Sequence, residues 1–183
     1  MFLGLDISTS ITGATILSPD GSMVLNESWD TRNKNKFPTL YEKANFVKSK
    51  ILSLQKKYQI DHIFVEQSLQ SFRSGFSSAK TLSTLSRFNG IVCWLCYDLL
   101  KIEPVPLAAA SARKAAGLKI KRGENAKQKV LSFVVDTQPN FIVEYTKQGN
   151  PKPGVFDRAD SYIIAKAGFL NARKIKLTQK RSG

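Results

Sequence analysis

The run Phe2-Leu-Gly-Leu-Asp-Ile-Ser8 opens the chain as a short apolar stretch that ends in polar residues, which is the pattern of a buried β-strand. Alternate side chains of a strand point to opposite faces, so Gly4 and Asp6 share one face. Gly4 leaves that face open for another element to approach. A carboxylate inside an apolar strand is unfavourable unless it is paired, hydrogen-bonded or metal-bound. Asp6 is therefore a candidate functional carboxylate, and a turn cap through Ser8 or Thr9 is the alternative.

Two more strands are expected directly after this one. They are Gly13–Ser18 and Met23–Trp29, and the turn Pro19-Asp-Gly-Ser22 joins them, because Pro fixes φ and Gly permits positive φ. Short connections make the three strands an antiparallel meander. Residues 30–38 are polar and basic and are expected to form a loop.

Helices and strands alternate in the rest of the chain. Apolar residues at steps of three and four predict an amphipathic helix over Leu40–Tyr58. The further elements expected are, in order, a strand at Ile60–Glu66, a long helix from near Phe76 to Leu100, a short strand at Ile102–Pro106, helices at Ala109–Ala116 and Glu124–Asp136, a flexible loop at 137–155 and a helix at Phe156–Asn171.

The order of these elements indicates the fold class. Three antiparallel strands that continue into strand–helix–strand crossovers predict an α/β fold with a mixed five-stranded sheet flanked by helices. We expect residues 1–171 to form a single domain and the basic residues 172–183 to form a disordered tail.

Charge is distributed unevenly along the chain. The 28 Lys and Arg residues outnumber the 14 Asp and Glu residues, which gives a net charge of +14. Residues 111–183 hold 16 basic and 5 acidic residues, a net of +11, whereas residues 1–110 hold 12 and 9, a net of +3. A one-sided excess of this kind favours a polyanionic partner, nucleic acid before membrane, over a merely soluble basic protein.

Several classes of protein are disfavoured by what the sequence lacks. No stretch approaches the roughly 20 apolar residues of a membrane span, and the N-terminus lacks a signal-peptide pattern. We therefore expect a cytoplasmic or nucleoid location, compatible with a phage, viral or organellar origin. Cys93 and Cys96 are expected to be buried helix residues, because His62 is the only histidine and a four-ligand zinc site needs more ligands.

Three more acidic residues stand where a strand or helix is expected to begin or end. Glu66 ends a strand at the kind of sheet edge where open α/β folds build their sites. Asp157 and Asp160 open the last helix, and their spacing places both on one face, where the helix N-terminus stabilises negative charge. A polar strand end and ordinary acid enrichment at a helix start are the alternatives.

Asp6, Glu66, Asp157 and Asp160 come from distant segments and would repel one another in a cluster unless cations lay between them. Oxygen ligands suit Mg²⁺ or Mn²⁺ rather than zinc. Two such ions about 4 Å apart clamp the attacking and leaving oxygens of a phosphodiester. An acidic, metal-binding pit within a basic surface indicates a nuclease.

Four groups of residues carry a family resemblance. They are Gly4-Leu-Asp6 with Ser8-Thr-Ser-Ile-Thr-Gly13; Val65-Glu-Gln67; Ala110-Ser-Ala-Arg-Lys114 and Gly117 through Gly123-Glu-Asn-Ala-Lys-Gln-Lys129; and Asp157-Arg-Ala-Asp160. In this order they resemble the motifs of RuvC-type Holliday junction resolvases of the RNase H-like superfamily, over most of residues 1–170. Many bacterial members carry His where this chain has Asp157, which puts a histidine-assisted mechanism in doubt.

The resemblance implies an RNase H-like fold and a homodimer that nicks two opposed strands of a four-way DNA junction. It implies that Asp6, Glu66, Asp157 and Asp160 are catalytic metal ligands, with two Mg²⁺ ions per active site, Mn²⁺ as a substitute, and Asp6 bridging both ions. In-line attack by a metal-activated water is the chemistry that follows. The apolar surface of the long helix, wider than one core contact needs, is a candidate dimer face.

Basic residues after the last expected strand are candidates for binding DNA phosphates, and a solvated basic loop is the alternative. They are Arg113, Lys114, Lys119, Lys121, Arg122 and Lys127. The resemblance also implies an aromatic residue after Glu66 that stacks on unpaired bases. Phe72, next to Arg73, is the better candidate, since Phe76 is equally consistent with core packing.

Three other functions remain open from the sequence. The segment from Asp6 to Gly13 is also similar to the phosphate loop of sugar- and acetate-kinase-like ATPases, although those enzymes need two such domains. A junction-binding protein without catalysis would need neither the metal nor the acids. A nuclease of the same fold that acts on RNA–DNA hybrids or other branched DNA would differ only in its substrate, since it must read the 2′-hydroxyl to tell RNA from DNA.

Overall fold

The computed structural model describes residues 1–67 and 79–181. In these ranges the elements are β1 (Phe2–Asp6), β2 (Ile11–Leu17), β3 (Met23–Asp30), α1 (Leu40–Lys57), β4 (His62–Glu66), α2 (Ala79–Leu100), β5 (Val105–Leu107), α3 (Ala109–Ala115), α4 (Ala126–Thr137) and α5 (Val155–Arg181). The start of the long helix that was expected near Phe76 lies outside the described residues. No helix in the described part of the chain is both long and apolar enough to span a bilayer.

The sheet has the mixed topology that the sequence predicts. Its strand order is β3-β2-β1-β4-β5, in which β1–β2 and β2–β3 are antiparallel and β1–β4 and β4–β5 are parallel. Leu5 pairs with Val65, so the next residues, Asp6 and Glu66, end two adjacent parallel strands. The prolines near β5 correctly predicted a strand at the edge of the sheet.

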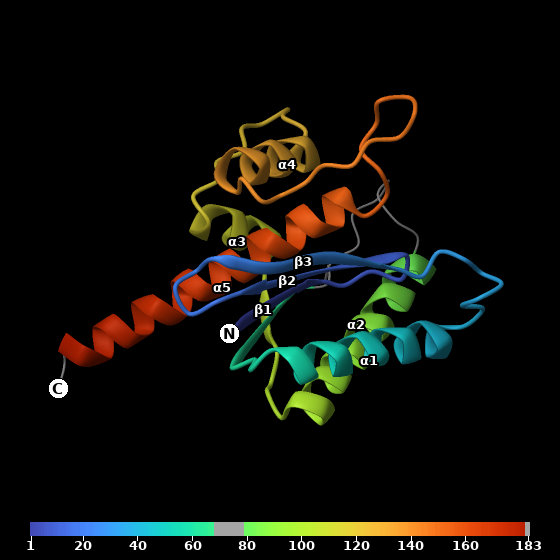
Figure 1. The fold of residues 1–183 in the computed structure, drawn as a ribbon, viewed down its shortest axis with the longest axis horizontal. Coiled ribbons are helices and arrows are strands. Elements are labelled where there is room, and N and C mark those ends of the chain that lie inside the picture. The colour runs from blue at the N-terminus through green and yellow to red at the C-terminus, as the bar shows by residue number, and fades with distance from the viewer. Residues whose placement is uncertain (68–78, 182–183) are drawn as a thin grey trace.

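Helices cover both faces of the sheet (Figure 1). Leu3 and Leu5 point to the face covered by α1 and α2, where they pack with Val47 and Val92 in one core. On the other face, Phe2 belongs to a second core formed with α3, α4 and α5. Each element therefore buries one side, which is the layered arrangement that an α/β sheet requires.

Helix α5 lies almost directly on β1 and β2. A Cβ atom at Gly4 would stand 2.4 Å from the backbone N of Ala165, and one at Gly13 would stand 1.9 Å from the carbonyl O of Asp157. Both strand positions must therefore be glycine for the helix to pack at this distance. The open face that Gly4 predicts is occupied by α5.

A buried polar network ties α5 to the sheet. The Thr15 and Ser161 hydroxyl oxygens are 2.8 Å apart. The Asn26 side-chain amide donates to Thr15 Oγ1 at 2.7 Å and to the carbonyl O of Arg158 at 2.9 Å. These hydrogen bonds join β2, β3 and the first turns of α5. The side-chain oxygen of Asn26 is buried without a hydrogen-bond partner.

The disordered tail expected from Ala172 is wrong, because α5 continues to Arg181 and projects beyond the sheet in Figure 1. Propagation from an already packed helix adds one hydrogen bond per residue and needs no new nucleus. The extension contains no Gly or Pro before Gly183 and is rich in good helix formers. Basic composition therefore did not imply disorder here.

The two cysteines lie on α2 and are both free. Cys96 is buried and Cys93 is half-buried, as expected of helix residues that pack in the core. Burial raises the pKa of the Cys96 thiol to about 12, so this cysteine stays protonated and unreactive.

The close approach of α5 makes a testable prediction about Gly13. We expect Gly13→Ala to lower the free energy of unfolding by about 3 kcal/mol, because its methyl group would overlap the Asp157 carbonyl. Gly90→Ala is the matched control, because its Cβ meets no atom within 4 Å on helix α2, and it should raise stability by about 1 kcal/mol. Urea denaturation of both variants measures the difference, and equal stabilities would contradict the packing.

Candidate active site

Four carboxylates gather at the end of the sheet where β1 and β4 stop. Asp6 and Glu66 are the last residues of these strands. Asp157 and Asp160 belong to the start of α5, where the Asp157 carbonyl lies against Gly13, the residue paired with Asp6. Three distant segments thus bring carboxylates to the same end of the sheet.

The pKa values of the four carboxyl groups are all raised, and burial is the first cause in each. Burial, followed by the charges of Glu66, Asp160 and Asp157, raises the pKa of Asp6 well above its ordinary value. Burial and then the charge of Asp160 raise the pKa of Glu66. Burial raises the pKa of Asp160 to about 6, and the charge of Asp157 adds to this effect. Burial also raises the pKa of Asp157 itself. The carboxylates repel one another in a poorly solvated space.

Two cations from the predicted basic segment lie near this cluster. The charge of Lys127, on α4, lowers the pKa of all four carboxyl groups. The charge of Arg113, on α3, lowers the pKa of Glu66 and Asp160. In each group burial is the largest effect, so the pKa stays raised although these cations lower it.

The chemistry of the donors fits a hard divalent cation such as Mg²⁺, since all four side chains offer only carboxylate oxygens. Within residues 1–67 and 79–181, however, no three His, Cys, Asp or Glu side chains stand in position to hold one metal ion.

The other basic candidates lie on α3 and in the connection to α4. Lys114, Lys119, Lys121 and Arg122 are exposed, and Arg113 is half-buried. Their exposure is compatible with phosphate binding, which stays a prediction. Phe72, Arg73 and Phe76 lie outside the described residues.

The sequence analysis missed two residues at the edge of the acid cluster. The charge of Arg32 lowers the pKa of Asp157, and that of Asp30 raises it. Asp30 is the last residue of β3. Because β3 runs in the same direction as β1, both strands end on the same side of the sheet, where the acids lie. The sequence pattern that could have identified them is an acid and an arginine placed just after a strand of the predicted meander.

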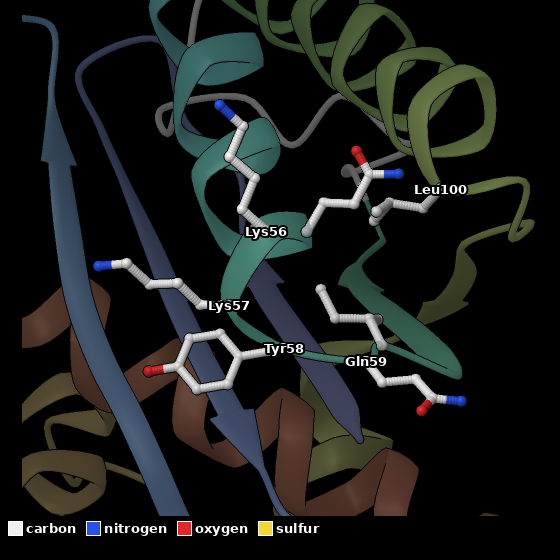
Figure 2. Close-up of a pocket in the computed structure, with 7 residues that line it drawn as sticks. Lys56, Lys57, Tyr58, Gln59 and Leu100 are labelled. Atoms are coloured by element: carbon white, nitrogen blue, oxygen red, sulfur yellow. The ribbon is translucent and has the colours of Figure 1, made fainter.

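A pocket of about 410 Å³ lies elsewhere, and Figure 2 shows its lining. The lining residues are Gln55, Lys56, Lys57, Tyr58, Gln59, Ile60 and Leu100. It lies where α1 ends and the chain enters β4, whereas Glu66 lies at the opposite end of that strand. The lining contains no carboxylate, so this pocket is separate from the acid cluster.

Comparison with solved structures gives the same fold. RuvC of T. thermophilus in complex with a Holliday junction substrate has a TM-score of 0.67 at 14% identity, covering 94% of each chain. A second Thermus thermophilus RuvC structure has a TM-score of 0.62 at 16% identity, covering 94% of this chain and 95% of the other. The protein has the RuvC fold.

The same RuvC fold is found in a eukaryotic enzyme. The yeast mitochondrial Holliday junction resolvase Ydc2 has a TM-score of 0.63 at 16% identity, covering 95% of this chain and 79% of its own. No family model and no curated relative matches the sequence. The RuvC fold is thus recognised in three dimensions at an identity too low for the sequence comparisons.

The raised pKa of Asp160 predicts how stability depends on pH. The folded protein binds this proton more tightly than the unfolded chain, because the pKa rises from the ordinary 3.8 to about 6. Stability without divalent cations should therefore fall as pH rises from about 4 to 6, and stay low above that range. Asp160→Asn should reduce this loss, because the other three acids keep their share of it, and should gain about 1–2 kcal/mol at pH 8.

Urea denaturation at pH 4.5 and pH 8 in EDTA checks this expectation. Asp136→Asn is the matched control, since Asp136 is exposed on α4, and it should follow the wild type at both values. If the free energy of unfolding changes with pH by the same amount in the wild type and in Asp160→Asn, the ionisation of Asp160 does not lower the stability of the folded protein.

Proposed function

We propose that the protein is a metal-dependent endonuclease that resolves four-way DNA junctions by paired, symmetric nicks. The observation that carries this proposal is the gathering of Asp6, Glu66, Asp157 and Asp160 at the sheet end of a RuvC fold. One of the proteins with this fold is described in complex with a Holliday junction, and another is named as a resolvase. The net charge of +14 suits a nucleic acid substrate.

The four carboxylates would hold two Mg²⁺ ions, and Mn²⁺ could replace them. Asp6 is the central ligand in this proposal, because the charges of the other three acids all raise its pKa. When bound, the cations would supply the positive charge that stabilises an in-line displacement at phosphorus. Their binding would release protons, since the carboxyl groups with raised pKa values must ionise to become ligands.

Residues of α3 and α4 would position the DNA backbone. The charges of Lys127 and Arg113 act on carboxyl groups of the acid cluster, so these residues would hold a phosphate that neighbours the cleaved bond. The exposed residues Lys114, Lys119, Lys121 and Arg122 extend this positive surface along the connection from α3 to α4. Contacts of this type carry no sequence information and make binding depend on salt.

The other candidate functions are less well supported. A kinase-like ATPase needs a second domain around its nucleotide, and the solved structures that share the fold over 94–95% of this chain are named as RuvC or a resolvase. A binding protein without catalysis gives no reason to gather four half-buried carboxylates. A nuclease for RNA–DNA hybrids shares the site, and only the choice of substrate separates it from a resolvase.

We propose that the working unit is a homodimer formed through α2. Trp94 and Tyr97 are 61% and 54% exposed on this helix, and their spacing of three residues places them on one face. Large exposed aromatic side chains are typical of protein interfaces. Two active sites in one particle would allow both strands to be nicked in pairs.

We propose that residues 1–171 form the nuclease domain. We also propose that the protein acts in the cytoplasm or nucleoid, which is compatible with a phage, viral or organellar origin. The yeast mitochondrial resolvase shows that this fold also serves in an organelle. The helical extension from Ala172 adds basic residues beyond that domain.

Cleavage of a labelled, immobile four-way junction tests the function. The wild type should cut two opposed strands symmetrically with Mg²⁺ and not with EDTA, and should cut duplex, single strand and RNA–DNA hybrid far less. Asp157→Asn should slow cleavage by roughly 100-fold or more, because a ligand of the catalytic site is lost. Asp136→Asn should cleave like the wild type. Tight binding without nicks, or preferred cutting of the hybrid, would contradict a junction resolvase.

Sedimentation of wild type and Trp94→Glu tests the dimer. A charge in an apolar interface is unfavourable, so the variant should become monomeric. It should then nick one strand of the junction at a time, without a second nick in the opposed strand. Tyr41→Glu changes an aromatic residue that is 68% exposed on α1 and should leave the dimer intact. A wild type that sediments as a monomer at all concentrations would argue against this face.

A further inference from the structure

Asp30 and Arg32 form an ion pair with a fixed geometry at the end of β3. Arg32 Nε donates to Asp30 Oδ1 at 3.0 Å, and Nη2 donates to Oδ2 at 2.6 Å. The backbone N–H of Arg32 donates to Oδ1 at 2.9 Å, so the carboxylate holds both the main chain and the guanidinium. This orients Arg32 far better than a single surface contact between two flexible side chains would.

Backbone contacts fix the pair beside the acid cluster. Thr31, between the two residues, is buried; its N–H donates to the carbonyl O of Ser10 at 2.8 Å, and its hydroxyl donates to that of Thr9 at 3.2 Å. Thr9 and Ser10 belong to the connection that follows Asp6. Residues 30–32 are therefore joined to the loop that leaves the central carboxylate.

The start of α5 approaches from the other direction. Ile11 pairs with Asp30 in the sheet, and its Cγ2 lies next to Gly154, immediately before α5. Two residues further along β2, Gly13 contacts the carbonyl of Asp157. Residues 30–32 and the start of α5 therefore both lie against the same end of β2.

Cations from two different parts of the fold act on the acids: Arg32 on Asp157, and Arg113 on Glu66 and Asp160. Arg32 follows β3 at one edge, whereas Arg113 lies on α3, which follows β5 at the other edge. A phosphate chain that crosses the carboxylates would meet a cation on each side. Lys34 and Lys36 are exposed in the same connection after β3 and continue the positive surface away from the site.

We propose that Arg32 binds a backbone phosphate of the DNA on the β3 side of the acid cluster, and that Asp30 is its positioning residue. This inference rests on the proposed function, since it requires a nucleic acid substrate. The guanidinium uses one edge for Asp30 and is half-exposed, at 49%, so its remaining N–H groups can form the two parallel hydrogen bonds that a phosphate accepts. The basic connection after β3 would thus supply a second set of phosphate contacts, in addition to those from α3 and α4.

Binding measured in EDTA at several salt concentrations tests the proposal without cleavage. Arg32→Ala should weaken junction binding about tenfold and reduce the slope of log Kd against log salt by about one. Arg32→Lys should keep the slope but not the full affinity, because the charge remains and the fork is lost. Lys56→Ala is the matched control: it removes one charge beside the remote pocket and should keep the wild-type slope and affinity within twofold.

Asp30→Asn should reproduce part of the Arg32→Ala effect only while Arg32 is present, so the double variant should bind no more weakly than Arg32→Ala alone. Thermal unfolding of each variant confirms that it folds. Arg32→Ala with the affinity and slope of Lys56→Ala would overturn the proposal. If the wild type cleaves no nucleic acid but Arg32→Ala still loses the salt-dependent contact, the nuclease function fails and the phosphate contact stands.

Discussion

The contact of α5 with β1 and β2 is the constraint on which the rest of the structure depends. It exists because Gly4 and Gly13 have no side chains and leave the strand surface bare. The helix settles so close that the carbonyl of Asp157 lies against the residue paired with Asp6. Any Cβ at these positions would lift the helix and separate the carboxylates of α5 from those of the strands. The packing of α5 against two glycines thus sets where the carboxylates of α5 lie relative to those of β1 and β4.

The assembled carboxylates are a local source of instability that the surrounding fold must overcome. Burial raises the pKa of all four groups, and the charges of neighbouring acids of the cluster add to it for Asp6, Glu66 and Asp160. The charge of Lys127 lowers all four pKa values, and that of Arg113 lowers those of Glu66 and Asp160. The hydrogen-bond network through Asn26, Thr15 and Ser161 holds the helix in place against the repulsion between the acids. Sites that bind cations are commonly less stable than the same fold without the charges, because function and not stability determines the residues there.

The positive charge of the molecule acts both at long range and at short range. The chain as a whole is strongly basic, which attracts a polyanion from a distance. At short range, in the arrangement that we propose, Arg113 and Lys127 would contact the phosphate backbone on one side of the acids and Arg32 would contact it on the other. A phosphate backbone guided by these contacts would approach carboxylates that otherwise repel it, and bound cations would reverse that repulsion at the point of reaction.

The sequence by itself determined the strand meander, the mixed sheet, the edge position of β5 and all four candidate acids. These follow from local patterns, since apolar runs, turn residues and charges at element ends express their preferences within a few residues of chain. Only the tertiary structure decided that α5 continues through the basic residues after Ala172, and that Lys127 on one side and Asp30 with Arg32 on another are near enough to the acids to shift their pKa values. The physical reason is that a side chain's surroundings depend on contacts between segments far apart in the sequence, and no local pattern records which segments will meet.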